Sequence, residues 1–122
     1  MKKILVIDDA GFFLRTVMVA LKDHYDVDVA NTALIADAKI AQKKPDLILL
    51  DYNMPDVTGV DYLVELREDP YTADIPVFFL TGTDDTQVVL DILKQKPNGY
   101  LLKSTPQEKI IEALEEFFNK AN

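Results

Sequence analysis

The sequence predicts one α/β domain in which helices cover both faces of a parallel sheet. Short apolar runs recur along the chain, and segments with helical spacing separate them. Strands that are apolar along their whole length are typical of a parallel sheet buried on both sides. The length of 122 residues fits a single domain over residues 1–122. Right-handed crossovers between such strands give a three-layer α/β sandwich.

Ten elements are expected. The strands fall at 3–8, 25–29, 46–51, 75–80 and 99–103, and the helices at 10–22, 32–43, 58–67, 84–95 and 105–119. The first strand is a continuous apolar run, and the turn at Asp8-Asp9 separates it from the first helix. The second strand alternates β-branched and acidic residues, as a strand at the sheet edge does. The second helix has Ala, Leu and Ile at helical spacing and stops before Pro45.

The third strand is fully apolar, and a proline-containing loop at 52–58 leads into the third helix, which ends before Pro70. Asp84-Asp85 opens the fourth helix, and the turn at 97–99 leads into the last strand. The last helix has the clearest start, because Thr105, Pro106 and Glu108 form a capping box with a proline at the first helical position. Its apolar face consists of Ile110, Ile111, Leu114, Phe117 and Phe118.

The first helix carries more apolar residues than one sheet-facing stripe needs. Leu14 and Met18, four positions apart, are expected to lie off that stripe. They would then form an exposed strip able to dock a helix bundle. The alternatives are a helix that is buried more deeply or one that is covered by a missing domain.

Composition excludes several classes of function. The formal net charge is −8, which argues against direct binding of nucleic acid or of an anionic membrane. The chain has no Cys, so disulfides and thiolate metal sites are excluded. The apolar run after Lys2-Lys3 is too short for a secretory signal, and no run reaches transmembrane length. A cytoplasmic protein is therefore expected.

Polar residues follow four of the apolar runs. They are Asp8-Asp9, Asp51, Thr81 and Lys103. Each alone has an ordinary explanation, since acids before a helix cap it and a lone lysine is usually solvated. Ligands of open α/β sheets, however, bind beyond the carboxyl ends of the strands, where these residues should meet. Clustered carboxylates repel one another unless a cation relieves them.

The residue types then suggest phosphoryl chemistry. Mg²⁺ prefers oxygen ligands, which two carboxylates and a carbonyl would supply. Asp51 could act as a nucleophile toward phosphorus, while Mg²⁺ and the Lys103 ammonium neutralise the phosphoryl oxygens. The Thr81 hydroxyl would hydrogen-bond one of those oxygens.

With these residues in place, the chain resembles a response-regulator receiver domain of two-component signalling, close to the single-domain chemotaxis type. The motif consists of Asp8, Asp9, Asp51, Met54-Pro55, Gly59, Thr81 and Lys103. The resemblance implies a flavodoxin-like (βα)5 fold with sheet order 2-1-3-4-5. It implies that Asp51 accepts phosphate from a histidine kinase or phosphotransfer protein.

The resemblance also assigns the remaining site residues. Mg²⁺ would be bound by Asp9, Asp51 and the Asn53 main-chain carbonyl, and by Asp8 largely through water. Thr81 and Tyr100 resemble the switch pair of the family. Ser104 follows Lys103 where the family usually has proline, so the bond there is either trans with an altered loop or strained. Tyr100 could equally be a half-buried packing residue.

The expected function is a phosphorylation switch and not that of an enzyme. The protein would catalyse only its own phosphorylation and dephosphorylation. It would act as a monomer or weak phosphorylation-dependent dimer and bind an unidentified downstream protein through residues 84–119.

The alternative is a receiver-like scaffold without phosphate turnover. A haloacid-dehalogenase-type phosphatase needs a second acid where Asn53 stands. A flavin carrier is disfavoured because Asp8-Asp9 would repel its phosphate. Asn53 and Thr83 would flank the phosphoryl group.

Overall fold

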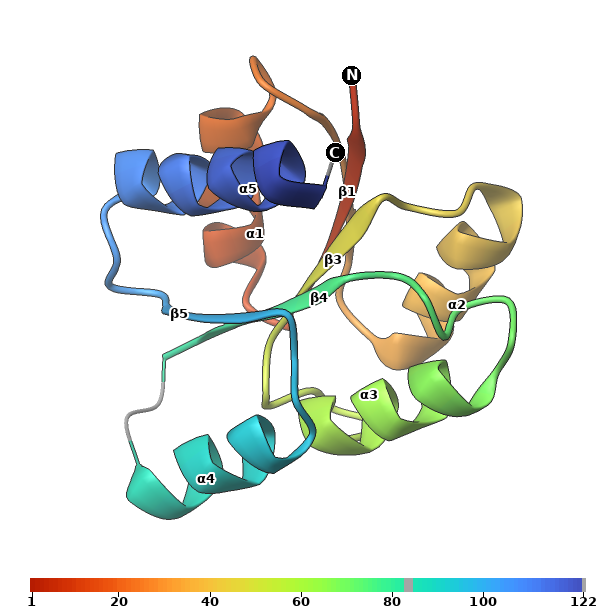
Figure 1. Cartoon of the computed structure of the whole chain (residues 1–122). Helices are drawn as coiled ribbons and strands as arrows, with labels where there is room; N and C mark the ends of the chain where they lie inside the picture. The colour runs from red at the N-terminus through yellow and green to blue at the C-terminus, as the bar shows by residue number, and fades with distance from the viewer. Residues whose placement is uncertain (83–84, 122) are drawn as a thin grey trace.

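Ten elements alternate between strand and helix along residues 1–82 and 85–121, the part of the chain that this computed structural model describes (Figure 1). Thr83 and Asp84, including the expected start of the fourth helix, lie outside the described residues. The order is β1 (Lys3–Ile7), α1 (Gly11–Leu21), β2 (Asp26–Ala30), α2 (Ala33–Gln42), β3 (Leu47–Leu50), α3 (Gly59–Glu68), β4 (Val77–Thr81), α4 (Thr86–Lys94), β5 (Gly99–Leu102) and α5 (Gln107–Ala121).

The strands form one parallel sheet in the order β2-β1-β3-β4-β5, which confirms the expected topology. The register fixes what lies together at the carboxyl edge. Ile7 of β1 pairs with Leu50 of β3, and Thr81 of β4 pairs with Leu102 of β5. The residues that follow Ile7, Leu50 and Leu102 therefore leave the sheet at the same edge, where ligands of such folds bind.

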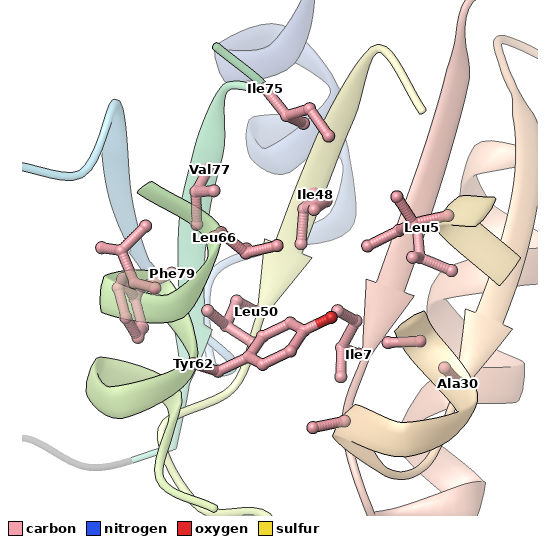
Figure 2. Packing of buried hydrophobic residues seen from close by; sticks show 14 of the residues in the cluster. Leu5, Ile7, Ala30, Ile48, Leu50, Tyr62, Leu66, Ile75, Val77 and Phe79 are labelled. Atoms are coloured by element: carbon pink, nitrogen blue, oxygen red, sulfur yellow. The ribbon is translucent and has the colours of Figure 1, made fainter. Parts of the chain in front are cut away.

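Two apolar cores lie on opposite faces of the sheet. One packs alternate residues of the strands against α2, α3 and α4, and Figure 2 shows the Tyr62 ring of α3 lying over this face near Ile7 and Leu50. The other core packs the remaining strand residues against α1 and α5. Figure 1 shows α1 and α5 together on one side of the sheet. Helices on both faces explain why the central strands are apolar along nearly their whole length.

The expectation for α1 was wrong at Leu14. Leu14, Val17 and Leu21 are the buried residues of this helix, so Leu14 belongs to the sheet-facing stripe. Their spacing of three and four residues is that of one helix face. Met18 is half-buried, and the large apolar side chains that α1 exposes are Phe12 and Val19.

The start of α5 also differs slightly from the expectation. The N–H groups of Lys109 and Ile110 donate to the carbonyl of Pro106, at 2.9 and 3.1 Å, so Pro106 precedes the helix and is not its first residue. The expected apolar face of α5 is confirmed, because Ile110 and Leu114 are buried and the other three residues pack against the same core.

Candidate functional site

Three carboxylates meet at the carboxyl edge of the sheet. Asp8 follows β1 and Asp51 follows β3, and the pairing of Ile7 with Leu50 places them side by side. Asp8 is 2% exposed and Asp51 is 5% exposed, whereas Asp9 is exposed to solvent. One oxygen from each of these three residues lies within 4.8 Å of the others. The structure thus brings together the acids that the sequence analysis selected.

Lys103 supplies the positive charge of this cluster. Its N–H donates to the Thr81 carbonyl at 2.8 Å, which fixes the end of β5 beside the end of β4. Its Nζ lies 2.5 Å from Asp8 Oδ2 and 3.6 Å from Asp51 Oδ2. Every peptide bond within residues 1–82 and 85–121 is trans, so the bond before Ser104 is the trans form. Lys103 therefore contacts Asp8 and Asp51 although Ser104, and not the proline usual in receiver domains, follows it.

The Asp51 carboxyl group is electrostatically perturbed. Burial and the neighbouring Asp8 charge raise its pKa, and Asp9 adds to this. Lys103 and the N–H of Tyr52 act in the opposite direction. The result is a pKa raised from 3.8 to about 6. Asp51 is therefore a carboxylate at neutral pH, but one whose negative charge is only partly compensated by the protein.

Asp8 does not cap α1, which was the ordinary explanation for an acid pair before a helix. The cap position of α1 is Ala10, which provides no side-chain hydrogen bond. Asp8 Oδ1 accepts from the Ala10 N–H at 2.9 Å. Asp8 Oδ2 is buried, and its partner is the Lys103 ammonium 2.5 Å away.

This donor set fits a hard divalent cation. All three side chains offer oxygen, which Mg²⁺ prefers, and the described ion pairs give these acids one ammonium, that of Lys103. Asn53, the fourth expected ligand, lies exposed in the loop two residues after Asp51. The residues of this edge can therefore hold a metal ion, and the role of each one as a ligand stays a prediction.

Hydrogen bonds hold the loop after β3 to its own ends and to α2. The N–H of Gly59 donates to the Tyr52 carbonyl at 2.6 Å, and a Cβ on Gly59 would overlap the Asp51 carbonyl oxygen. Only glycine can approach so closely, which explains the glycine at the start of α3. The Asp56 carboxylate accepts from the N–H groups of Ala33 and Leu34, each at 3.2 Å, and thereby caps α2.

The two expected switch residues lie on neighbouring strands. Thr81 is the last residue of β4 and is 1% exposed. Tyr100 of β5 pairs in register with Phe79 and is half-buried against the core formed with α2, α3 and α4. Half-burial is compatible with both a switch and a packing role for Tyr100, so its switch role stays a prediction. Thr83, expected to flank the phosphoryl group, lies outside the described residues.

Sequence reasoning missed two contacts of the site. It counted Phe13 only among the apolar residues of α1, yet the Lys103 ammonium lies 4.7 Å from the centroid of the Phe13 ring. It also gave no sign that Asp56 caps another helix. Both contacts join residues from distant parts of the chain, and no local pattern reports such pairs.

Similarity to known proteins covers nearly the whole chain. Residues 4–115 match the response regulator receiver domain family. The chain is 35% identical over 102 residues to the transcriptional regulatory protein KdpE of Staphylococcus aureus, covering 83% of this chain and 43% of that protein. It spans about half the length of two further curated regulators that it matches.

Other matches agree in length with this chain. The chemotaxis protein CheY of Pseudomonas aeruginosa is 28% identical over 125 residues, with 98% of both chains covered. The crystal structure of the phosphorylated cyanobacterial phytochrome response regulator RcpA superposes with a TM-score of 0.83 at 28% identity, covering 99% of this chain and 96% of that one. Separately, no helix in the described part of the chain is long and apolar enough to cross a bilayer.

Proposed function

The chain belongs to the response regulator receiver domain family of two-component signalling, and on this premise we propose that it is a phosphorylation switch whose phosphoacceptor is Asp51. Receiver domains are phosphoacceptor regulators and not enzymes that turn over an external substrate. The observation that carries the proposal is the position of the buried Asp51, which lies beside the Asp8 carboxylate and 3.6 Å from the Lys103 ammonium. We extend the receiver assignment to residues 1–122.

In the proposed reaction, an Asp51 carboxylate oxygen attacks the phosphorus of the donor. A new P–O bond forms while the bond from phosphorus to the leaving group breaks, and the leaving group departs with the electron pair. The Lys103 ammonium lies 3.6 Å from Asp51 Oδ2, and Thr81 lies at the end of the adjacent strand. We assign Lys103 to charge neutralisation and Thr81 to a hydrogen bond with a phosphoryl oxygen.

We assign metal binding to Asp8, Asp9, Asp51 and the Asn53 main-chain carbonyl. Bound Mg²⁺ would neutralise charge on the phosphoryl oxygens. The support is the oxygen-only donor set and the excess of three carboxylates over the single Lys103 ammonium in the described ion pairs. The protein's own part is to hold the acids within reach of one another before any cation arrives.

The phosphodonor in the cell is proposed to be a sensor histidine kinase or a phosphotransfer protein, and the location to be cytoplasmic. Related chains include transcriptional regulators, but a direct contact with nucleic acid is not part of the proposal. The net charge of −8 disfavours such a contact. The chain would act as a monomer or as a weak dimer formed on phosphorylation.

Acetyl phosphate tests the proposed reaction. Incubation with this donor and Mg²⁺ should add one phosphoryl group to the intact protein by mass spectrometry, with acetate as the leaving group. Asp51→Asn should abolish the addition, and EDTA should prevent it. Asp23→Asn, which removes an exposed charge before β2, should leave it unchanged. A protein that gains no mass under these conditions would instead support the scaffold alternative.

The output of the switch is proposed to be the face formed by α4, β5 and α5. Leu90 and Leu93 of α4 are each 49% exposed, and β5 lies at the sheet edge beside Thr81. Beryllofluoride with Mg²⁺ should shift the amide NMR signals of Thr81, Tyr100 and this face in the wild-type protein. The same additions to Asp51→Asn should leave those signals in place. Shifts confined to the acidic pocket would contradict a switch on this face.

A further inference from the structure

Lys103 has further contacts besides its ion pairs with Asp8 and Asp51. The main chain is fixed by the hydrogen bond to Thr81, and the side-chain stem passes Gly82, where a Cβ would lie 3.8 Å from Lys103 Cδ. The ammonium then lies 4.7 Å from the Phe13 ring centroid. The side chain is only 20% exposed. An aromatic ring from α1 thus faces the same ammonium that the two acids attract.

A lysine side chain depends on neighbouring contacts for its orientation more than an arginine side chain does. Its ammonium is a point charge on a flexible stem, so nothing in its own geometry directs it at a carboxylate. The face of an aromatic ring attracts a cation within about 6 Å of the centroid, and the attraction grows when the pair is shielded from water. Lys103 meets both conditions, because its distance to the ring is shorter and its side chain is largely covered.

We propose that Phe13 is a positioning residue for Lys103, whose ring holds the ammonium toward Asp8 and Asp51. The inference rests on the proposed phosphoryl transfer for its functional consequence, but not for the contact itself. It gives α1 a direct part in the phosphorylation site. It also supplies an anchor for a lysine that is followed by serine and a trans peptide bond.

Simple packing is the competing explanation for Phe13. Its ring is half-buried and contacts the core between the sheet, α1 and α5. The neighbouring residue separates the two explanations, since Phe12 is the same residue type one position away and is 78% exposed. Among the described contacts, Phe12 has no aromatic or cation–π partner. Phe12→Leu is therefore a matched control for Phe13→Leu.

The rate of phosphorylation by acetyl phosphate and Mg²⁺ measures the functional effect. Phe13→Leu should lower the rate constant by about threefold to tenfold, the range that a partly shielded cation–π contact supports. Phe13→Tyr keeps a ring and should stay within about twofold of the wild-type protein. Phe12→Leu should match the wild-type rate. In a Lys103→Ala background, Phe13→Leu should cause no further loss, because the two residues act through one contact.

NMR measures the contact without any phosphorylation. The ring should shift the Lys103 Cε protons upfield of those of the other lysines in the wild-type protein and in Phe13→Tyr. The shift should disappear in Phe13→Leu. If the wild-type Lys103 protons are unshifted, the inference is wrong even when Phe13→Leu does not fold.

Two further outcomes separate the contact from packing and from the proposed function. If Phe13→Leu lowers the rate by the same factor with and without the Lys103→Ala substitution, Phe13 has a packing role only and the inference is overturned. A wild-type protein that is not phosphorylated refutes the proposed function, while the proton shifts still decide the contact.

Discussion

Asp51→Asn should make this protein more stable in the absence of divalent cations. Asp51 is buried beside Asp8, and these two effects raise its pKa to about 6 despite Lys103. A carboxylic acid whose pKa is raised on folding destabilises the folded state once it is ionised. Asparagine has nearly the same shape and no charge, so it removes the repulsion with little change in packing.

The size of the effect follows from the change in pKa. A rise from 3.8 to about 6 is roughly two pKa units, and each corresponds to about 1.4 kcal/mol. Asp51 should therefore lower the free energy of unfolding by about 3 kcal/mol at pH 7.5. This contribution is small at pH 4 and vanishes well below 3.8, where the group is protonated both folded and unfolded, and it develops as the pH rises toward 6. For a chain of this length, the melting temperature should rise by about 10 °C.

Thermal unfolding followed by circular dichroism tests this prediction. In EDTA at pH 7.5, the variant should melt well above the wild-type protein, and the gap should nearly close at pH 4. Added Mg²⁺ should stabilise the wild-type protein by up to about 3 kcal/mol at a hundredfold excess over its dissociation constant. The Asn variant should respond much less, because it lacks one of the proposed ligands.

Asp23→Asn separates a local effect from a general one. It removes one negative charge from a protein of net charge −8. Asp23 is exposed, lies between α1 and β2, and is not one of the clustered acids. If both variants are stabilised equally, overall charge and not the pocket is responsible. A variant at Asp51 that melts at or below the wild-type temperature in EDTA at pH 7.5 would refute the electrostatic account of this site.

Two further predictions concern the rest of the fold. Burial raises the pKa of Asp28, but the hydrogen bonds from Lys39 and from the N–H of the next residue outweigh it and give a net lowering. Its stabilisation is therefore present above about pH 4 and lost below, so Asp28→Asn should cost about 0.5–1 kcal/mol in urea unfolding at pH 6 and less at pH 3. Gly99→Ala should cost about 1–3 kcal/mol, because the added Cβ would lie 2.6 Å from the Phe78 ring. Gly11→Ala is the control, since its Cβ would meet a side chain at 3.8 Å, and equal effects of the two alanines in urea unfolding would contradict the steric argument.

The order of elements and the sheet topology could be predicted from the sequence because both depend on local patterns. Apolar runs report burial on two faces, and the intervening helical spacings report the crossovers. The boundaries were less exact for tertiary reasons. Tyr25, expected to start β2, instead donates its N–H to the Leu21 carbonyl and packs its ring 5.7 Å from that of Phe118. The hydrogen bond to Leu21 is local, but the Tyr25–Phe118 contact joins chain positions far apart and leaves no local signal.

The site divides in the same way. Asp8, Asp51 and Lys103 could be selected because each directly follows a strand, and the parallel sheet then brings the ends together. Leu14 could not be placed correctly, because an apolar helix offers several possible stripes and only the packing selects one. Phe13 was indistinguishable from the other apolar residues of α1 for this reason. Its distance to Lys103 depends on how α1 is seated on the sheet.

Charge balance in the pocket connects its stability with its proposed chemistry. Three carboxylates face one ammonium, so the formal charges of these described side chains, three negative and one positive, sum to −2. A divalent cation would balance them, which a monovalent cation could not. A phosphoryl group would add further negative charge at the same place. The repulsion among these carboxylates lowers the free energy of unfolding of the protein without a divalent cation. Binding of a cation, and then of a phosphoryl group, should therefore have a large effect on the strands around the pocket. Stability that depends on neither Mg²⁺ nor Asp51 would remove the basis for a switch at this edge.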